Sequence, residues 1–228
     1  MFNPDPKIQL VPIPGFKPCI VVDNFVQNPQ ALVELALRER HNFANAAKNA
    51  FPGRELRMPD GFSALLNDFF IQHVRKQLGI RRTLSLFSRL SMITLQPHEL
   101  APNQRVCHQD QITDIPNLCF SALVLYLFKN PALGGTSFYA PKISPAEVNR
   151  LYSPTSVIAE HDHQNYITES SAHFELIRTI PAVWNRAIFY DSGIFHSGHI
   201  TDPGLLSADP AAGRLTLNGF FTCQKAAG

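Results

Sequence analysis

Residues 84–95 read Leu-Ser-Leu-Phe-Ser-Arg-Leu-Ser-Met-Ile-Thr-Leu. Leu84 and Leu86 alternate with Ser85 and Phe87. Side chains two residues apart share one face of a strand, so this period of two predicts a β-strand. Further along the chain, short strand-like runs follow one another between turn residues. We therefore expect a mainly β core from about residue 83 onward.

The C-terminal runs also set the expected fold class. The chain holds 18 prolines and 17 phenylalanines in 228 residues, which favours short strands and turns over long helices. Their arrangement is typical of an α+β protein that is mainly β, with a β-sandwich or jelly roll at its centre. The expected strands are 83–96, 105–109, 119–128, 135–140, 155–160, 176–180, 187–190, 194–199 and 214–223.

Residues 1–82 are predicted to form a helical part that packs on the β core of residues 83–228, within a single domain, 1–228. Asn28 and Pro29 are an N-cap and a first helical residue, and they open a helix that runs to about Arg40. A helical period also runs through residues 61–78. The remaining expected elements are an edge strand in 8–13, a buried strand over 19–22, a turn at 51–54, a stop at Gly79 and a helix capped by Ser144.

Composition excludes several classes of function. The net charge is +2 and no basic run exceeds Arg81-Arg82, so we expect no nucleic-acid partner. No run reaches the roughly 18 apolar residues of a membrane span, and the N-terminus lacks a leader pattern. The four cysteines form no C-x-x-C pair and are read as reduced thiols. We expect a cytoplasmic protein without a membrane partner, and its oligomeric state, including a homo-oligomer, stays open.

One short motif carries metal chemistry. His108 and Asp110 are two residues apart, within Val-Cys-His-Gln-Asp at 106–110. On a strand they would share one face, about 6–7 Å apart at the backbone, which is close enough to bind one metal ion. One more histidine would complete a facial 2-His-1-carboxylate set, which suits non-haem Fe(II) because it leaves coordination positions open.

Two histidines are candidates for that third ligand. His196 and His199 follow the turn Asp191-Ser-Gly193, and on a regular strand they would point to opposite faces. Only one of them is expected to join His108 and Asp110, and the spacing leaves the choice open. A competing cluster, His161-Asp162-His163, lies in a polar stretch and is read as a solvated loop.

A clamp for an acidic ligand is predicted further on. Arg214 and Thr216 fall on one face of the strand at 214–223. A guanidinium binds a carboxylate with two hydrogen bonds, and a hydroxyl adds a third donor, so this pair suits a small dicarboxylate.

These motifs together resemble the 2-oxoglutarate- and Fe(II)-dependent oxygenases, and the prolyl-4-hydroxylase-like branch most closely. The resemblance covers about residues 84–223, and the N-terminal part is similar to uncharacterised bacterial members. The motifs, in chain order, are His108-x-Asp110, Leu125-Tyr-Leu127, Gly134-Gly-Thr-Ser-Phe138, His196-Ser-Gly198 and Arg214-x-Thr216.

The resemblance implies a double-stranded β-helix in which His108, Asp110 and His196 are both the metal ligands and the catalytic residues. It implies Fe(II) as the cofactor and 2-oxoglutarate as the co-substrate, the latter bound by Arg214, Thr216 and Tyr126. The implied activity is that of an oxygenase, and we expect a hydroxylase. The substrate stays open: a small molecule, a peptide or a protein side chain.

One departure from the family pattern leaves alternatives. The 18 residues from His196 to Arg214 (214 − 196) are about twice the usual gap, so residues 201–213 are read as an inserted loop that forms a lid or a substrate rim. The insertion keeps His199 open as the ligand. The rival functions are a jelly-roll metal-binding module and a cupin-like enzyme, both without 2-oxoglutarate turnover. A structural β-sandwich with accidental residues is a third rival.

Overall fold

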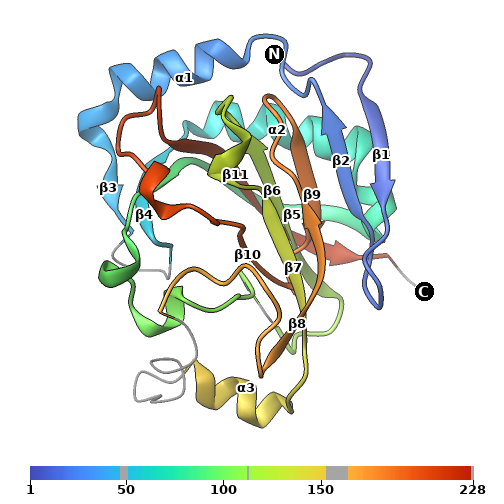
Figure 1. Cartoon of the computed structure of the whole chain (residues 1–228). Coiled ribbons are helices and arrows are strands. Elements are labelled where there is room, and N and C mark those ends of the chain that lie inside the picture. The colour runs from blue at the N-terminus through green and yellow to red at the C-terminus, as the bar shows by residue number, and fades with distance from the viewer. Residues whose placement is uncertain (47–50, 112, 153–163, 227–228) are drawn as a thin grey trace.

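A computed structural model describes residues 1–46, 51–111, 113–152 and 164–226. Its main feature is an eight-stranded antiparallel sheet with the strand order β1-β2-β9-β6-β11-β5-β4-β3 (Figure 1). A second sheet has the order β10-β7-β8. The protein is therefore mainly β, as the sequence predicts. The strands are β1 (Lys7–Val11), β2 (Cys19–Asp23), β3 (Ala44–Asn45), β4 (Gly53–Arg57), β5 (Ile80–Ile93), β6 (Leu118–Tyr126), β7 (Thr136–Pro141), β8 (Phe174–Ile180), β9 (Ala187–Asp191), β10 (Phe195–Gly198) and β11 (Arg214–Lys225).

Within the described residues, three α-helices accompany the sheets: α1 (Pro29–Arg38), α2 (Asp60–His73) and α3 (Pro145–Leu151). The predicted caps are confirmed, because Asn28 accepts a hydrogen bond from the Ala31 amide and Ser144 accepts one from the Glu147 amide. The helix predicted over 61–78 ends at His73, and a 3-10 turn, Arg75–Leu78, completes it. Gly79 then stops the segment in the left-handed conformation, with φ 64°.

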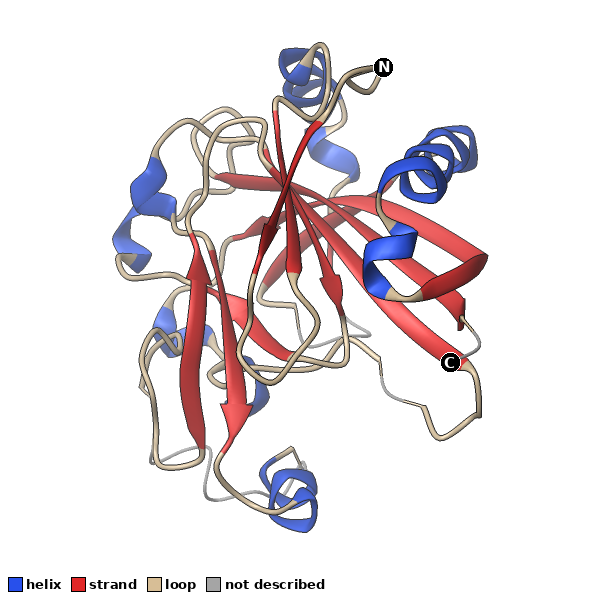
Figure 2. Ribbon diagram, turned by 90° about the vertical axis from the view of Figure 1, so that its right-hand side faces the viewer, coloured by secondary structure: helices blue, strands red, loops and turns tan. Residues whose placement is uncertain are grey.

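The large sheet has two different faces. One face packs under α1 and α2 in a core that includes Leu66, Phe70, Leu90, Leu123 and Phe221. The small sheet lies across the other face, and the two sheets meet in a second core (Figure 2). The space between the sheets is therefore lined by alternate residues of the large sheet.

Two local predictions are wrong. Residues 105–109 do not form a strand, since His108 makes only an isolated bridge to His196. The expected turn at 51–54 instead leads directly into β4 at Gly53. A Cβ at Gly53 would stand 1.9 Å from the Met92 carbonyl oxygen, so the close approach of β4 to β5 needs glycine there.

The N-terminal part is more than a helical cover. It supplies strands β1 to β4 of the large sheet, and β1 is the edge strand that the sequence predicts. The strand expected at 155–160 and the cluster His161-Asp162-His163 lie outside the described residues. Across the described ranges, no helix has the length and apolar character needed to cross a membrane. All four cysteines are described, buried and unpaired.

The register between β5 and β11 determines which side chains of the two strands lie opposite one another. From Arg214 to Thr222 the even-numbered residues of β11 face the small sheet, and each lies opposite an odd-numbered residue of β5. We call these cross-strand pairs rungs. In order from the start of β11 they are Arg214–Ile93, Thr216–Ser91, Asn218–Arg89 and Phe220–Phe87.

Candidate metal centre and its cavity

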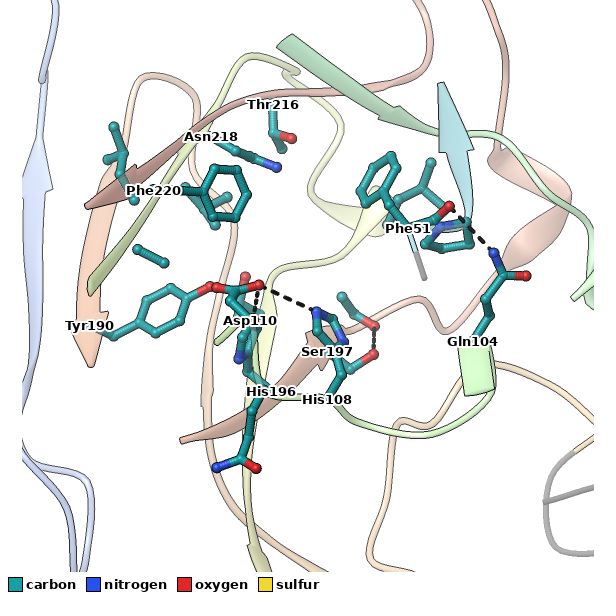
Figure 3. Close-up of a pocket in the computed structure, with 18 of the residues that line it drawn as sticks. Phe51, Gln104, His108, Asp110, Tyr190, His196, Ser197, Thr216, Asn218 and Phe220 are labelled. Atoms are coloured by element: carbon teal, nitrogen blue, oxygen red, sulfur yellow. Dashed lines mark hydrogen bonds and ion pairs between the residues drawn. The ribbon is translucent and has the colours of Figure 1, made fainter. Parts of the chain in front are cut away.

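A cavity of about 410 Å³ lies between the two sheets. His108, Asp110, His196, Arg214 and Thr216 all line it (Figure 3). Five of the six site residues that the sequence predicts therefore meet in one space, although they come from three separate parts of the chain.

His108 and His196 face each other across the isolated bridge. The His108 amide donates to the His196 carbonyl at 2.9 Å, and the His196 amide donates to the His108 carbonyl at 2.8 Å. This reciprocal pair holds the two rings 4.5 Å apart between centroids. The Asp110 amide donates to the Ser192 carbonyl at 3.3 Å, so the turn before β10 also fixes Asp110. The backbone thus preorganises all three side chains.

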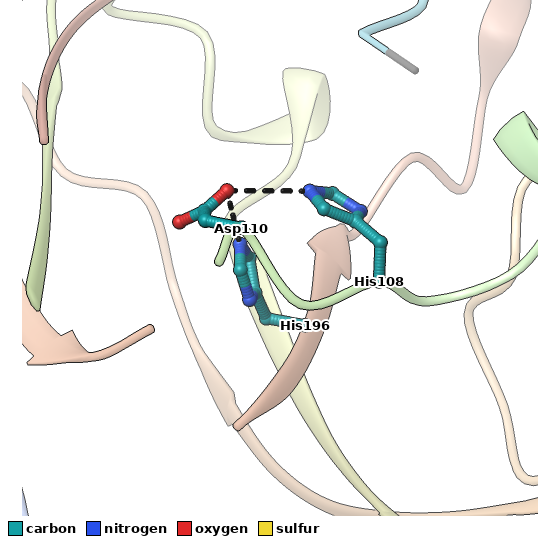
Figure 4. Close-up of side chains that lie close together, drawn as sticks. All are labelled: His108, Asp110 and His196. Atoms are coloured by element: carbon teal, nitrogen blue, oxygen red, sulfur yellow. Dashed lines mark ion pairs between the residues drawn. The ribbon is translucent and has the colours of Figure 1, made fainter. Parts of the chain in front are cut away.

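The three side chains converge on one point (Figure 4). Asp110 Oδ1 lies 3.7 Å from His108 Nε2 and 3.5 Å from His196 Nε2. Ligands about 2.1 Å from one metal ion, at angles of about 90–109°, lie about 3.0–3.4 Å apart. The observed spacing is a few tenths of an ångström wider, so the set fits a metal ion after a small contraction.

Hydrogen bonds leave the right atoms available for a metal. His196 Nδ1 lies 3.0 Å from the Ile194 carbonyl, which can only accept, so Nδ1 carries the proton and Nε2 offers its lone pair. Asp110 Oδ2 is buried and has no hydrogen-bond partner in the part of the chain that the structure describes. An unpaired buried carboxylate oxygen is costly, and a bound cation would remove that cost. The residues therefore fit a divalent metal ion.

Electrostatics keep the group ready to bind a cation. Burial opposes the charge of Asp110, but the two imidazoles outweigh it and hold the pKa of Asp110 well below its usual range. Burial and the neighbouring His196 lower the pKa of His108. Burial also works against the charge of His196, yet Asp110 outweighs it and raises the pKa of His196. At neutral pH the site thus holds an ionised carboxylate and at least one neutral imidazole.

His199, the alternative third ligand, lies elsewhere. Its Nδ1 is 2.9 Å from the Ser137 hydroxyl, and the residue does not line the cavity. Burial and the charge of Arg214 lower the pKa of His199. Among the described residues, the group of three that can share a metal ion is His108, Asp110 and His196.

Arg214 is anchored deep in the cavity wall. Its Nε donates to the Gly134 carbonyl at 3.2 Å, and its Nη2 donates to the Gly135 carbonyl at 2.7 Å. Its Nη1 makes no hydrogen bond to the described residues. Burial lowers the pKa of Arg214, although an arginine stays protonated in practice. Arg214 is therefore a fixed cation in the same cavity as the metal group, and its Nη1 remains available as a hydrogen-bond donor.

Thr216 and Tyr126, which are expected to bind the co-substrate together with Arg214, differ in their positions. The Thr216 hydroxyl donates to the Ser91 carbonyl at 3.3 Å, and Thr216 lines the cavity. Tyr126 does not line it, because its hydroxyl donates to Thr136 at 2.9 Å. Thr136 is the residue that reaches the cavity, so Tyr126 fixes Thr136 there.

Comparison with known proteins identifies a family. The model of a family described as "Family of unknown function (DUF6445)" matches residues 4–221. The chain belongs to this family. No curated protein matches the sequence of this DUF6445 member.

Solved structures with a similar chain path share little sequence with the DUF6445 chain. A Pseudomonas putida prolyl-4-hydroxylase is 15% identical with a TM-score of 0.48, over 94% of this chain and 95% of the other. HygX from Streptomyces hygroscopicus, with nickel, 2-oxoglutarate and hygromycin B bound, is 12% identical with a TM-score of 0.44, over 89% and 82%. AviO1 from Streptomyces viridochromogenes Tue57 is 11% identical with a TM-score of 0.48, over 91% of each chain.

The cavity of the DUF6445 chain also has a lining that the sequence motifs do not reveal. Figure 3 shows Tyr190 with its hydroxyl directed toward Asp110, and its ring lies 4.9 Å from that of His196. Burial and the charge of Asp110 raise the pKa of Tyr190 well above its usual range, so its hydroxyl stays protonated. The available sequence signal for Tyr190 was its spacing of two residues from Ile188, which places both side chains on the same face of β9. Phe51, Arg89, Gln104, Tyr152, Tyr166, Asn218 and Phe220 are further lining residues.

The predicted insertion, residues 201–213, does not line the cavity. Leu206 packs against a small core formed by Ile93, Leu100, Tyr166 and Ile200. The insertion therefore packs against two residues that line the cavity, Ile93 and Tyr166, and its role as a lid or substrate rim stays a prediction.

Gly135 gives a stability prediction for the anchor of Arg214. A Cβ at Gly135 would stand 1.9 Å from the Ile180 carbonyl oxygen, so Gly135→Ala must displace backbone. We expect a loss of about 3 kcal/mol in the free energy of unfolding, measured by urea denaturation. Gly61→Ala is the control, since a Cβ there meets nothing within 4 Å, and it should leave stability unchanged or slightly raised. Equal stability of the two variants would contradict the close approach at Gly135.

Proposed function

We propose that the protein is a non-haem Fe(II)- and 2-oxoglutarate-dependent oxygenase, with hydroxylation as its reaction. One observation carries the proposal: His108, Asp110 and His196 converge in a cavity that also holds the buried Arg214. The facial set suits Fe(II) because it leaves coordination positions open for other ligands. The fixed guanidinium supplies the second requirement, a binding partner for a carboxylate.

His108, Asp110 and His196 would hold the iron. Asp110 offers two oxygens, of which Oδ2 has no partner among the described residues, and each histidine offers Nε2. The charge of the carboxylate favours a dication, and the hydrogen bond from His196 Nδ1 to the Ile194 carbonyl orients that ring. Iron and 2-oxoglutarate would together supply the oxygen-activating chemistry.

Arg214 would bind the far carboxylate of 2-oxoglutarate. Its Nη1 is without a hydrogen bond to the described residues, and the Thr216 hydroxyl lies one rung along on the same face of β11. The Thr136 hydroxyl, which accepts from Tyr126, adds a polar group to the same wall. In this arrangement Arg214 and Thr216 contact the co-substrate, and Tyr126 positions Thr136.

The remaining lining excludes water and orients the substrate. Aromatic side chains, including Tyr152, Tyr166, Tyr190 and Phe220, line the cavity. The same aromatic wall lowers the local dielectric and strengthens each polar contact inside. We extend the proposal to the architecture, in which the two packed sheets form a double-stranded β-helix within one domain.

The decisive experiment is an anaerobic titration of the Fe(II)-loaded protein with 2-oxoglutarate. We expect the weak visible charge-transfer band that a chelated 2-oxo acid gives with ferrous iron. His196→Ala removes the band because it removes a ligand, whereas His199→Ala keeps it because His199 bonds Ser137.

Two controls give this titration its meaning. Fe(II) without the protein, and the protein with 2-oxoglutarate but without Fe(II), must show no band. Iron binding without a band would contradict the proposal and would favour the cupin-like reading, in which the metal acts without the 2-oxo acid. A band that depends on His199 would contradict the ligand assignment alone.

A further inference from the structure

The Asn218–Arg89 rung lies beyond the reach of the co-substrate. Asn218 follows Arg214 by four positions along β11, which corresponds to about 13 Å at the rise of a strand. A five-carbon dicarboxylate held at Arg214 is shorter than that distance. Both Arg89 and Asn218 nevertheless line the cavity. They therefore belong to a second subsite of the same space.

Arg89 is held rigidly in this second subsite. Its Nη1 pairs with Glu55 Oε1 at 2.7 Å. Its guanidinium carbon lies 5.6 Å from the centre of the Phe51 ring and 4.6 Å from the centre of the Phe220 ring. Phe220 stacks in turn on Phe87, with 4.8 Å between ring centres. The guanidinium thus lies between aromatic rings, and the charges of Glu55 and Asp110 both stabilise its protonated form.

Arg89 and Asn218 both have an unmet hydrogen-bonding group. Arg89 Nε is a buried donor without a partner among the described residues, and Asn218 Oδ1 is an acceptor in the same condition. Asn218 is 9% exposed, and its Nδ2 makes one long hydrogen bond, 3.3 Å, to the Ser91 hydroxyl. An unmet buried polar group destabilises a fold, and a bound ligand that supplies the missing partner removes that cost.

The unmet groups concentrate in this cavity. Six buried side-chain atoms of the described residues lack a partner, and three of them belong to residues that line the cavity: Arg89, Asp110 and Asn218. The proposed metal accounts for Asp110. Neither the metal nor 2-oxoglutarate accounts for Arg89 and Asn218, which are opposite each other on one rung.

We infer that Arg89 and Asn218 bind a neutral amide group of the primary substrate, an inference that rests on the proposed function. The amide oxygen accepts from Arg89 and the amide N–H donates to Asn218. The apolar part of the substrate packs on Phe51, Phe87 and Phe220.

Charge favours an amide over an ion at this position. Glu55 already balances Arg89, and the acceptor of Asn218 repels a carboxylate. A substrate ammonium would meet the guanidinium of Arg89 and is repelled as well. The cavity lining also includes four uncharged carboxamides: Asn103, Gln104, Gln109 and Gln111.

Three phenyl compounds of the same length test the inference: 3-phenylpropanamide, 3-phenylpropanoate and 3-phenylpropylammonium. Each is titrated calorimetrically into the protein loaded with Fe(II) and 2-oxoglutarate under argon. We expect the amide to bind at least about tenfold more tightly than either ion, the effect of one lost hydrogen bond between well-placed groups. Equal affinity for the three compounds, or no binding of the amide, overturns the inference.

Two substitutions test the residues. Arg89→Lys keeps the charge beside Glu55 but removes the Nε donor, and Asn218→Leu removes the acceptor. Each is expected to weaken amide binding about tenfold and to leave the charge-transfer band and the 2-oxoglutarate affinity unchanged. The matched controls are Arg57→Lys, which lies opposite Arg89 on β4, and Asn67→Leu, whose Oδ1 is also unpaired but lies outside the cavity. Wild-type amide affinity in both cavity variants overturns the inference, and Arg89→Lys decides alone if Asn218→Leu does not fold.

Further titrations show which kind of amide the subsite binds. The same experiments distinguish failure of the amide subsite from failure of the oxygenase proposal. The lactam 3,4-dihydroquinolin-2-one and the peptide unit of N-acetylphenylalanine N-methylamide are titrated beside the carboxamide, and the tightest binder identifies the source. Amide binding that depends on Arg89 and Asn218 without any charge-transfer band means that the oxygenase proposal fails and the subsite stands. A charge-transfer band without any preference for the amide means that the oxygenase proposal stands and the amide subsite fails.

Discussion

Asp110→Ala is expected to lower Fe(II) affinity by more than about 100-fold, beyond the upper range for the loss of an outer-shell partner of a metal ligand. We expect a large effect because Asp110 is the one anion of the proposed ligand set, and its Oδ1 lies within 3.7 Å of both imidazoles. The proposed turnover should disappear with the metal. Equilibrium dialysis of Fe(II) under argon measures the affinity, and circular dichroism checks the fold.

Two further variants show whether the effect belongs to Asp110 itself and whether it depends on the charge of the carboxylate. Asp114→Ala removes an exposed carboxylate from the same segment and is expected to bind iron normally. Asp110→Asn keeps the shape but not the charge, and we expect it to lie close to Asp110→Ala because a neutral amide is a poor ligand. Wild-type iron affinity in Asp110→Ala would eliminate this residue as a ligand.

Local sequence patterns predict those parts of the fold that depend on neighbouring residues. The alternation at Leu84 and Leu86 lies in β5, Asn28 caps α1, and Gly79 ends the segment that follows α2. Each of these features depends on periodicity or on one backbone conformation. Such signals are complete within a few residues, so they can be read directly from the sequence.

Features that depend on distant contacts were not predictable in this way. The start of β4 at Gly53 follows from its approach to the Met92 carbonyl, far along the chain. The convergence of His108 and Asp110 does not come from a regular strand, since His108 has only its bridge to His196. The metal group is therefore predictable as a set of residue types, while its geometry depends on tertiary structure.

The choice between His196 and His199 shows the same limit. A strand argument places them on opposite faces but does not say which face meets Asp110. The structure separates them by their partners, because His196 lies opposite Phe138 on β7 and His199 bonds Ser137. Arg89 and Asn218 gave no local signal at all, since their pairing appears only when β5 and β11 are in register.

Arg214→Ala is expected to raise the 2-oxoglutarate concentration that half-saturates the protein by about 100-fold. A charge-assisted hydrogen bond contributes about 1.5–3 kcal/mol, and each 1.4 kcal/mol is a factor of ten in affinity. Iron affinity should stay unchanged, because Arg214 belongs to no part of the ligand set. The measurement is the charge-transfer titration repeated on the variant, with iron affinity determined in parallel.

Thr216→Val is the matched comparison for Arg214→Ala. It removes one neutral hydroxyl from the next rung of β11, and the expected loss is roughly tenfold or less. The loss of 2-oxoglutarate affinity should be larger in Arg214→Ala because Arg214 carries a charge. Arg214 is a buried cation held by the Gly134 and Gly135 carbonyls, so its remaining donor would meet a carboxylate with little reorganisation. An unchanged 2-oxoglutarate dependence in Arg214→Ala would remove the clamp from the proposal, and a larger effect in Thr216→Val would move the carboxylate away from Arg214.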